Sequence, residues 1–454
     1  MSSSFPVKTI IQLTNEPLSL DPTFVEDGAG LMVLSNTSAG LMGYNAEGQL
    51  IKKLAASYRA TGQVYDFYLR ADARWSDGKQ IESQDFLYAW NRLQTSGSKF
   101  RPFFESISSI EAISPSHLRI KLAQPAAWLL HALTLPPMYP QRPQMVFSGP
   151  YVLKKHLRDR ALFLVKNPYW SITAQSIQCA EFLIVSDDMT ALRLVGSQRL
   201  DVATRLPLFH EPKKTVSEPF FATYYLSFAT TKKPFDDVRW RRALVGALDK
   251  ETIVNALSPH SRPASSWIPF GIEGYESFVD ERALFQEDME WAKKQVPYSF
   301  EFAFDANPRN QRMAEKIHYD LKMLPLQIAL KQYDWRTYVA TIRLRTPPLF
   351  RFARLSPLAD PSLHLAVFTS GDPSNFSGFS DPRYDALVAR IMTLAPSALR
   401  RQLIAEAQHI LLREQTVVIP LYHYVSRIAL SEKVKAFRMN PFGMIQITDI
   451  QVQP

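Results

Sequence analysis

Apolar and polar residues alternate in short stretches of the first third of the chain and then follow a helical spacing. The alternation over 65–70 predicts a β-strand, and the turn residues 76–78 follow, where Gly78 can take a positive φ at little cost. Ser83 is predicted to cap the next helix, because its hydroxyl can accept a bond from a free N–H of the first turn. The apolar face of this helix consists of Phe86, Leu87, Trp90 and Leu93.

The same patterns recur in the second half of the chain. The stretches 298–304 and 327–333 alternate as strands around a helical stretch at 310–324, and this β-α-β order predicts a second α/β unit. Another helix is predicted over 396–415. Its apolar face is expected to consist of Leu399, Leu403, Ala407, Ile410 and Leu411. The chain is therefore predicted to be an α/β protein of two or three domains.

Composition and charge narrow the classes of function. The chain is 46% apolar and 21% charged, as is usual for a globular protein, and its net charge of +9 suits a solvated basic surface or an anionic partner. No long run of Lys and Arg and no zinc-ligand spacing accompany this charge, so we expect no nucleic-acid binding. Arg239, Arg241 and Arg242 are expected to be solvated residues at the start of a helix. The single cysteine, Cys179, allows no internal disulfide and is expected to be buried as a small apolar residue.

The chain has none of the short motifs that mark common enzymes. It lacks the serine elbow G-x-S-x-G, the metalloprotease motif H-E-x-x-H, paired Cys-x-x-Cys, and the glycine-rich loops that bind nucleotides. Its nine histidines are scattered. We therefore expect neither catalysis nor a metal or cofactor, although a hydrolase whose residues meet only in the fold remains the alternative of another class.

Two long motifs resemble a known family. Residues 75–90 read Trp-Ser-Asp-Gly-Lys-Gln-Ile-Glu-Ser-Gln-Asp-Phe-Leu-Tyr-Ala-Trp, and residues 233–244 read Lys-Pro-Phe-Asp-Asp-Val-Arg-Trp-Arg-Arg-Ala-Leu. Both resemble signatures of the extracellular solute-binding proteins, family 5, the oligopeptide, dipeptide and nickel receptors of ABC importers. Further landmarks follow in the family order from residue 9 to residue 450.

The resemblance implies an α/β, two-lobed periplasmic-binding-protein-like fold (class II, cluster C) with an extra small domain. Residues 1–30, 144–250 and 425–454 would form lobe I, 31–143 the extra domain, and 251–424 lobe II. Ligand would bind between the lobes and favour their closure. The ligand would be a short peptide, with a nickel chelate, a sugar or a modified amino acid as the alternatives for a receptor of the same fold.

The resemblance also indicates where ligand would bind. In oligopeptide receptors an aromatic residue lies sixteen positions before an arginine, as Trp335 and Arg351 do here, and an extended strand follows, which would be 354–358. Residues 26–28 would lie at the edge of the cleft. The expected ligand-binding residues are Glu26, Asp27, Gly28, Asn310, Trp335, Arg351, Arg354, Leu355, Ser356, Pro357, Leu358 and Asp360.

One position departs from the family pattern. Pro357 stands where oligopeptide receptors carry the aspartate that binds the ligand's amino terminus, and proline has neither a charge nor an N–H. Recognition of the α-ammonium is therefore expected to be lost or moved to Glu26, Asp27 or Asp360. Ligands could then include γ-linked tripeptides such as glutathione beside ordinary short peptides.

No signal peptide and no apolar run of transmembrane length is visible in the chain. Together with the resemblance, this suggests a mature form in the periplasm or on the outer face of the cytoplasmic membrane. The expected partners are a permease and an ATPase on other chains, with membrane association through the transporter or a removed lipid anchor, as in lipoproteins of this class. The absence of any heptad or long apolar face predicts a monomer.

Overall fold

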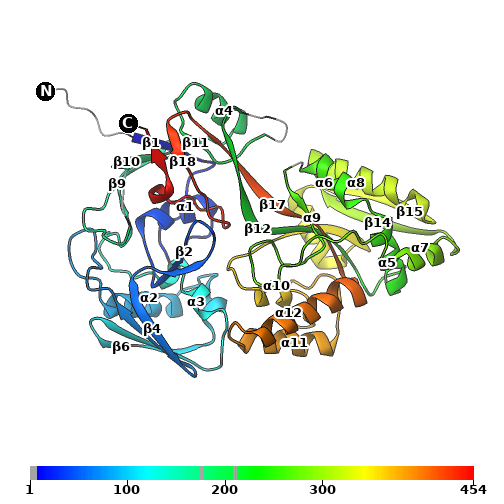
Figure 1. Cartoon of the computed structure of the whole chain (residues 1–454), viewed down its shortest axis with the longest axis horizontal. Coiled ribbons are helices and arrows are strands. Elements are labelled where there is room, and N and C mark those ends of the chain that lie inside the picture. Colours follow the sequence, from blue (N-terminus) through cyan, green and yellow to red (C-terminus); the bar gives the residue numbers. More distant parts are fainter. Residues whose placement is uncertain (1–7, 174–176, 208–209, 211, 259, 454) are drawn as a thin grey trace. The chain divides into compact units, whose positions relative to one another are not determined.

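The computed structural model describes residues 8–173, 177–207, 210, 212–258 and 260–453, which form two compact units. Unit 1 comprises the chain up to Glu218 and from Ser426 onward, and unit 2 comprises Pro219–Val425. The chain passes from one unit to the other inside two long strands, β12 (Thr215–Phe228) and β17 (Val418–Leu430) (Figure 1).

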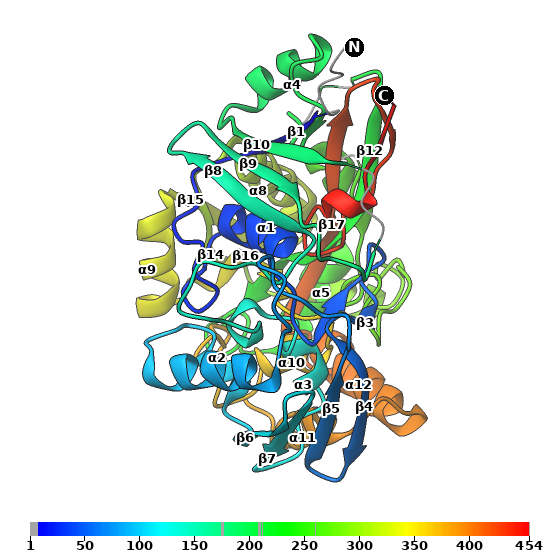
Figure 2. The same ribbon diagram turned by 90° about the vertical axis from the view of Figure 1, so that its left-hand side faces the viewer.

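The main sheet of unit 1 has the strand order β17-β11-β1-β10-β9-β8. Its central pair is parallel, with Ile11 opposite Phe182, and both side chains are fully buried in the core. The helix α1 (Gly28–Thr37) packs against β8 (Figure 2). The strand bounds are β1 Lys8–Leu13, β8 Tyr151–Leu157, β9 Ala161–Lys166, β10 Cys179–Ile184 and β11 Val202–Ala203.

A second, four-stranded sheet in unit 1 confirms the strand predicted over 65–70. Its order is β4-β5-β7-β6, entirely antiparallel, and α2 (Ser83–Thr95) packs against β6. The turn before α2 has Gly78 at φ +87°, as its glycine predicts. The strands are β4 Ala55–Thr61, β5 Val64–Leu69, β6 Ile107–Ser114 and β7 His117–Leu122.

The predicted cap of α2 is wrong by one residue. Glu82 occupies the N-cap, and its N–H donates to the Asp85 carboxylate at 2.9 Å, while the Ser83 hydroxyl turns to the carbonyl of Ser114. Asp85 is fixed there because it also accepts from the Trp75 indole at 3.0 Å and from Arg142 at 2.7 Å. The Trp75–Asp85 spacing of the long motif therefore has a structural role.

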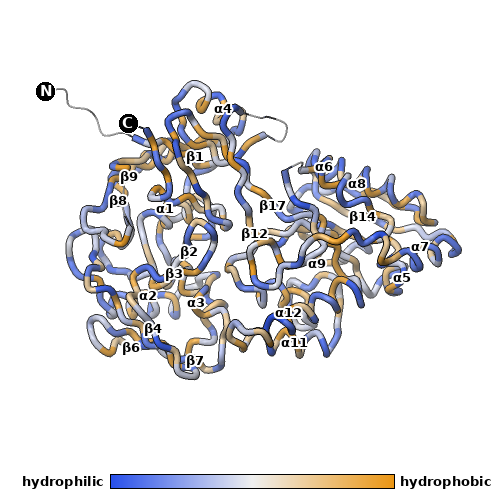
Figure 3. Tube along the Cα trace, viewed as in Figure 1, coloured by the Kyte–Doolittle hydropathy of each residue, from blue (hydrophilic) through white to orange (hydrophobic). Residues whose placement is uncertain are grey.

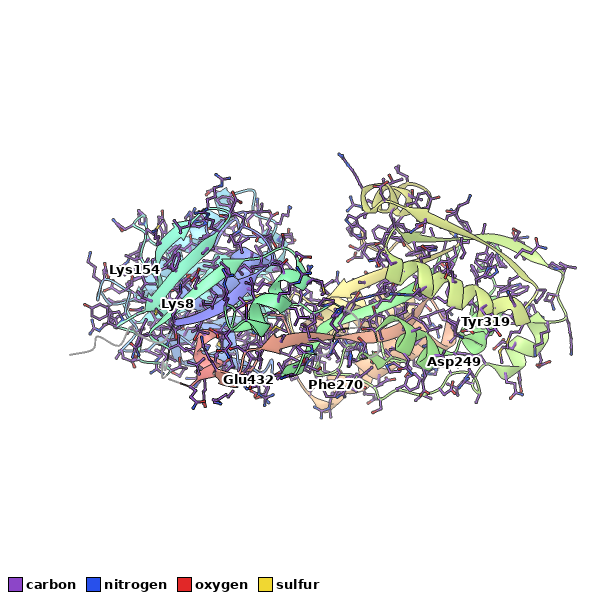
Figure 4. All side chains as sticks on the ribbon, turned by 90° about the horizontal axis from the view of Figure 1, so that it is seen from above. Lys8, Lys154, Asp249, Phe270, Tyr319 and Glu432 are labelled. Atoms are coloured by element: carbon purple, nitrogen blue, oxygen red, sulfur yellow. The ribbon has the colours of Figure 1, made fainter. Side chains whose placement is uncertain are left out.

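Unit 2 contains the predicted β-α-β unit. Its sheet has the order β15-β14-β16-β12-β17, with β14 (Tyr298–Asp305) parallel to both β15 (Leu326–Tyr333) and β16 (Leu349–Leu355). The connecting helix α8 (Pro308–Asp320) packs beside α6 (Lys250–Leu257), and Figure 4 labels Asp249, which caps α6, and Tyr319 on α8. Hydrophobic and hydrophilic residues alternate along α8 at helical spacing (Figure 3).

The helix predicted over 396–415 is shorter and ends in a wider turn. It runs as α12 (Ala398–His409) and continues as a π-helix over Ile410–Glu414, beside α11 (Pro382–Thr393) (Figure 1). Four of its five predicted apolar positions are buried. Leu399 is the exception, 42% exposed in the first turn, so the prediction for it was wrong.

The remaining elements are short or peripheral. The pair α5 and α7 packs together in unit 2, and α9 packs against β14 and β15. Their bounds, with those of the other elements, are β2 Met42–Tyr44, β3 Leu50–Lys52, α3 Leu129–Ala132, α4 Asp188–Gly196, α5 Val238–Ala247, β13 Arg262–Pro263, α7 Gln286–Ala292, α9 Trp335–Arg345, α10 Ser362–Ala366, β18 Val434–Ala436 and β19 Gln451–Val452. Short 3-10 turns cover Arg101–Phe104, Pro136–Met138, Leu321–Met323 and Ile447–Asp449.

By packing, residues 219–250 belong with 251–424, whereas the sequence placed them in lobe I. The helix α5 contributes Trp240 and Leu244 to the same core as Phe302 of β14. None of the helices among the described residues has the length and apolar character needed to cross a membrane.

Arg241 is not solvated, contrary to prediction. It is 3% exposed, and its guanidinium donates to the carbonyls of Phe235 at 2.6 Å and of Gln415 at 2.6 and 2.9 Å. Burial lowers the pKa of Arg241 to about 10, which still leaves it charged at neutral pH. Backbone carbonyls that follow the π-helix thus replace water around this cation.

A second buried arginine holds the segment after β16. Arg400 of α12 is 1% exposed and makes two 2.9 Å bonds to the carboxylate of Asp360, which is 2% exposed. A third bond, at 2.7 Å, reaches Glu273. Arg401, the next residue, is exposed, and its guanidinium lies 3.9 Å from the carboxylate of the same Glu273, too far for a hydrogen bond.

Replacing Arg400 by alanine is expected to lower the free energy of unfolding by about 3–5 kcal/mol, because it leaves the Asp360 carboxylate buried without a counter-charge. Arg401→Ala is the matched control and should change it by less than about 0.5 kcal/mol. Urea denaturation followed by tryptophan fluorescence measures both. Equal effects of the two variants would contradict this account of Asp360.

His423 of β17 gives the fold a pH dependence. It is 4% exposed, its Nδ1 lies 3.2 Å from the Thr223 hydroxyl, and its Nε2 has no partner among the described residues. Burial, reinforced by the Lys250 charge, lowers the pKa of His423 to about 3. The folded state therefore keeps the ring neutral where the unfolded state would bind a proton.

Since the unfolded pKa is about 6.5, this contribution to stability is complete above pH 6.5 and is lost as the pH falls toward 3. At pH 5 the free energy of unfolding should therefore be lower by about 2 kcal/mol than at pH 7.5. In His423→Gln the loss between these two pH values should be smaller by that amount. His409→Gln, at an exposed position, should keep the wild-type difference in the free energy of unfolding between the two pH values. Urea denaturation at both pH values measures this difference.

Candidate functional site

The candidate site of unit 2 is built around Arg351 in the middle of β16. Its guanidinium forms an ion pair with the carboxylate of Asp305, the last residue of the neighbouring strand β14. The two residues are 7% and 9% exposed. A charged pair this deep is tolerated because each ion compensates the other.

Three aromatic rings surround the Arg351 guanidinium. Its central carbon lies 5.5 Å from the ring centre of Tyr224, 5.7 Å from that of Tyr338 and 5.9 Å from that of Trp335. Each ring face attracts a cation by about 0.5–2 kcal/mol. The Tyr338 hydroxyl also donates to the carbonyl of Arg351, which fixes the strand against α9. The Nε of Arg351 is buried and has no hydrogen-bond partner among the described residues.

Asn310 lies behind the ion pair. Its amide nitrogen donates to Oδ1 of Asp305 at 2.8 Å, and its oxygen accepts from the Tyr224 hydroxyl at 2.7 Å. Asn310 is 2% exposed, so in this structure it orients the carboxylate. Burial is also the main reason that the pKa of Tyr224 is raised far above its usual value, which keeps its hydroxyl a donor.

Trp335 forms the exposed side of the site. It begins α9, whose N-cap Asp334 accepts from Thr337 at 3.1 Å, and its indole is 56% exposed. The ring also lies 6.0 Å from that of Phe352 on β16. The structure thus brings together three predicted site residues, Trp335, Arg351 and Asn310.

The extended strand predicted over 354–358 is shorter in the structure. The ladder between β12 and β16 ends at the pair Ala222–Leu355, with one more bond from the Ser356 N–H to the Phe221 carbonyl at 2.8 Å. Leu355 is 57% exposed, whereas Leu358 is fully buried. The chain turns here because Pro357 has no N–H to continue the ladder.

The neighbours of this strand end are polar, and two of them, Ser356 and His364, are buried. Arg354 donates to the carbonyl of Leu363 at 3.0 Å, and the Ser356 hydroxyl is hydrogen-bonded to His364. Burial, with the nearby Arg354 charge, lowers the pKa of His364 well below its usual value. His364 is therefore neutral at physiological pH.

The other predicted acids already have partners. Asp27 of unit 1 caps α1, accepting from Gly30 at 2.9 Å and from Leu18 at 3.1 Å. Glu26 is ion-paired with the exposed Lys99, and Gly28 is the first residue of α1. Asp360 is held by Arg400, as described above.

Sequence reasoning missed three residues of the site: Asp305, Tyr224 and Tyr338. The end of a predicted parallel strand was a usable signal for Asp305, because such ends commonly carry binding groups. The two tyrosines gave no signal, since aromatics at strand and helix spacing usually form core. No group of three or more His, Cys, Asp or Glu able to hold a metal occurs within the described part of the chain.

Known proteins resemble the chain over nearly its whole length. The periplasmic murein peptide-binding protein MppA of Escherichia coli K12 is 24% identical over 94% of this chain and 90% of its own length. The periplasmic oligopeptide-binding protein OppA of Salmonella typhimurium is 25% identical over 91% and 86%.

Solved structures share the fold. That of MppA, described as a periplasmic murein tripeptide binding protein in its unliganded open form, gives a TM-score of 0.88 at 22% identity, over 98% of this chain and 97% of its own. That of HbpA2 from Haemophilus parasuis gives 0.89 at 18% identity, over 99% and 100%. The predicted two-lobed α/β solute-binding fold is confirmed.

A family model covers most of the chain. The model described as "Bacterial extracellular solute-binding proteins, family 5 Middle" matches residues 49–376, which include both long motifs and the Arg351 site. The chain therefore belongs to the family 5 bacterial extracellular solute-binding proteins.

Proposed function

We propose that this protein is the substrate-binding receptor of an ABC importer and that it captures short peptides. The observation that carries the proposal is the Arg351 site, a charged group held among aromatic rings beside an exposed tryptophan. Peptide receptors need polar groups that fix the ends of a ligand and apolar surfaces that accept varied side chains. The names of the relatives, which describe periplasmic peptide-binding proteins, support the same function.

Arg351 is proposed to bind a carboxylate of the ligand. A guanidinium matches a carboxylate with two parallel hydrogen bonds, and Arg351 has unused donor capacity at Nε. The exposed face of Trp335 would cover the adjoining part of the peptide. Arg354 and Leu355 continue the same strand and are proposed to border the peptide backbone.

The α-ammonium of an ordinary peptide is proposed to lack a dedicated acid. Pro357 has no charge, and the carboxylates of Asp27 and Asp360 are taken by a helix cap and by Arg400. Glu26 is paired with Lys99, where solvent weakens any further interaction. Ser356 and Leu358 are proposed to shape this end of the site through the turn that they form with Pro357.

The chain is proposed to act without catalysis. The relatives are binding proteins, and the neutral His364 is paired with Ser356 in the interior of unit 2. We further propose that it works as a monomer outside the cytoplasmic membrane, with permease and ATPase on other chains. We propose that lobe I and lobe II follow the two compact units, with residues 219–250 in lobe II, and that residues 31–143 form an extra domain of lobe I.

Arg351→Ala is expected to weaken a carboxylate-bearing peptide by about 1.5–3 kcal/mol, the usual value of a charge-assisted hydrogen bond. Arg336→Ala, at an exposed position on the same helix as Trp335, is the control and should bind like the wild type. Isothermal titration with a tripeptide measures both. A change below about threefold in Arg351→Ala would remove Arg351 from the binding site.

Acetylating the amino terminus of an ordinary α-linked tripeptide is expected to change its affinity by less than about threefold, because no free acid awaits the ammonium. The same titration compares the free and acetylated peptides on the wild-type protein. Loss of binding on acetylation would show that an acidic anchor exists, and Glu26→Gln, Asp27→Asn and Asp360→Asn would then locate it.

A further inference from the structure

The hairpin formed by β8 and β9 in unit 1 has an excess of positive charge. Residues 151–166 contain five lysines and arginines and a single acid, Asp159. Four of these cations are exposed and form no ion pair with any acid in the described part of the chain. These four residues, which we call the hairpin patch, are Lys154, which Figure 4 labels, Lys155, Arg158 and Arg160.

The acids next to the hairpin do not neutralise this patch. Glu16 contacts the hairpin, but its carboxylate is bonded to His156 at 2.6 Å and accepts from the N–H of Asp159 at 2.9 Å. Asp159 lies in the turn, at φ +57°. Even with both acids counted, the five cations of the hairpin leave an excess of three positive charges.

A second exposed sheet face in unit 1 carries charge of both signs. On the four-stranded sheet, Asp66 binds Arg119 at 2.8 Å and His117 at 2.7 Å. Beside them, Lys121 is paired with Glu111 at 2.5 Å. Cations on that face are matched by acids, whereas the hairpin patch lacks such partners. A positive potential therefore extends from the hairpin into the solvent.

Part of this charge has a structural explanation. Strand β8 lies at the end of the strand order, and lysines and bulges at such an edge prevent pairing with another chain. Lys154 lies at a bulge, because the register with β9 shifts between Leu153 and Lys155. Arg158 and Arg160, however, lie in the turn after the strand, where they do not protect its edge. Their charge calls for a binding partner.

The composition of the patch indicates the kind of partner that it fits. Protein interfaces have a buried apolar or aromatic centre, whereas residues 151–166 expose no large apolar side chain. Surfaces that bind single-stranded nucleic acids add aromatic rings on which bases stack, and the exposed residues of the hairpin include none. A membrane with anionic lipids requires only several lysines and arginines near one surface.

We propose that the hairpin patch binds the anionic phospholipid head groups of a membrane. This contact is direct, so it is separate from attachment through a permease or a lipid anchor, and it does not depend on the proposed peptide ligand. The four cations act together, because each is attracted by the surface potential without having to fit a particular head group. The contact is reversible and is weakened by salt, since the side chains involved are solvated.

The first test measures how the wild-type protein co-sediments with lipid vesicles. At about 0.02 M salt, vesicles of phosphatidylcholine with about a third of phosphatidylglycerol should bind it at least about tenfold more tightly than vesicles of phosphatidylcholine alone. Raising the salt to about 0.5 M should release most of the bound protein. Equal binding to the two kinds of vesicle, or no binding to either, contradicts the proposal.

The second test separates the patch from the total charge of the protein. Replacing the four residues of the hairpin patch by glutamine should weaken binding to the anionic vesicles by at least about tenfold. The control removes the same number of charges from exposed positions of unit 2 and should stay within about twofold of the wild type. Its substitutions are Lys294→Gln, Lys322→Gln, Lys331→Gln and Arg336→Gln. Similar losses in both variants would mean that net charge alone attracts the protein and would overturn the role of the hairpin.

A double variant serves if loss of both lysines makes the sheet edge aggregate. Arg158→Gln combined with Arg160→Gln leaves the edge strand unchanged and should still weaken vesicle binding by at least about threefold. Wild-type affinity for anionic vesicles in this variant would refute the role of the turn. Titration of the same variants with a tripeptide tests the proposed function separately, because peptide affinity should equal that of the wild type whatever the vesicles show.

Discussion

The structure of unit 2 depends on buried charged side chains whose charges are compensated by other groups of the protein. Removing an ion from water costs several kcal/mol, and the cost is recovered only where an opposite charge or several oxygen acceptors replace the solvent. Arg400 has Asp360 and Glu273, Lys250 has Glu281, and Arg351 has Asp305. Arg241 has backbone carbonyls alone. These contacts join helices to strand ends that are distant in sequence, and so they fix where the segment after β16 turns.

The parts of the molecule that could be predicted from the sequence are those that depend on neighbouring residues in the chain. Strands at 65–70, 298–304 and 327–333 depend on alternation, a local property, and the structure contains all three. The family and its fold were predicted from long motifs whose residues stabilise the structure. One example is the hydrogen bond from the Trp75 indole to the Asp85 carboxylate. Local signals of this kind can be interpreted without knowledge of the rest of the chain.

What could not be predicted depended on partners far along the chain. Ser83 was the predicted cap of α2. Glu82 takes that position because its N–H donates to Asp85, an aspartate that Trp75 and Arg142 hold in place. Arg241 looked like a surface residue because most of its acceptors, the carbonyls of Gln415 and Thr416, are far along the chain. Asp305 was missed for the same reason. Its importance comes from Arg351, which the parallel pairing of β14 and β16 brings beside it.

The exposed indole of Trp335 gives the candidate site an optical reporter of its own. Trp75 and Trp267 are 2% and 0% exposed and will emit as indoles in an apolar, rigid environment whatever the ligand does. Trp335 is 56% exposed and close to a permanent charge pair, so its emission depends on water that a ligand would displace. Occupancy of the site should therefore shift the emission of this one residue to shorter wavelength, without any label attached to the protein or to the peptide.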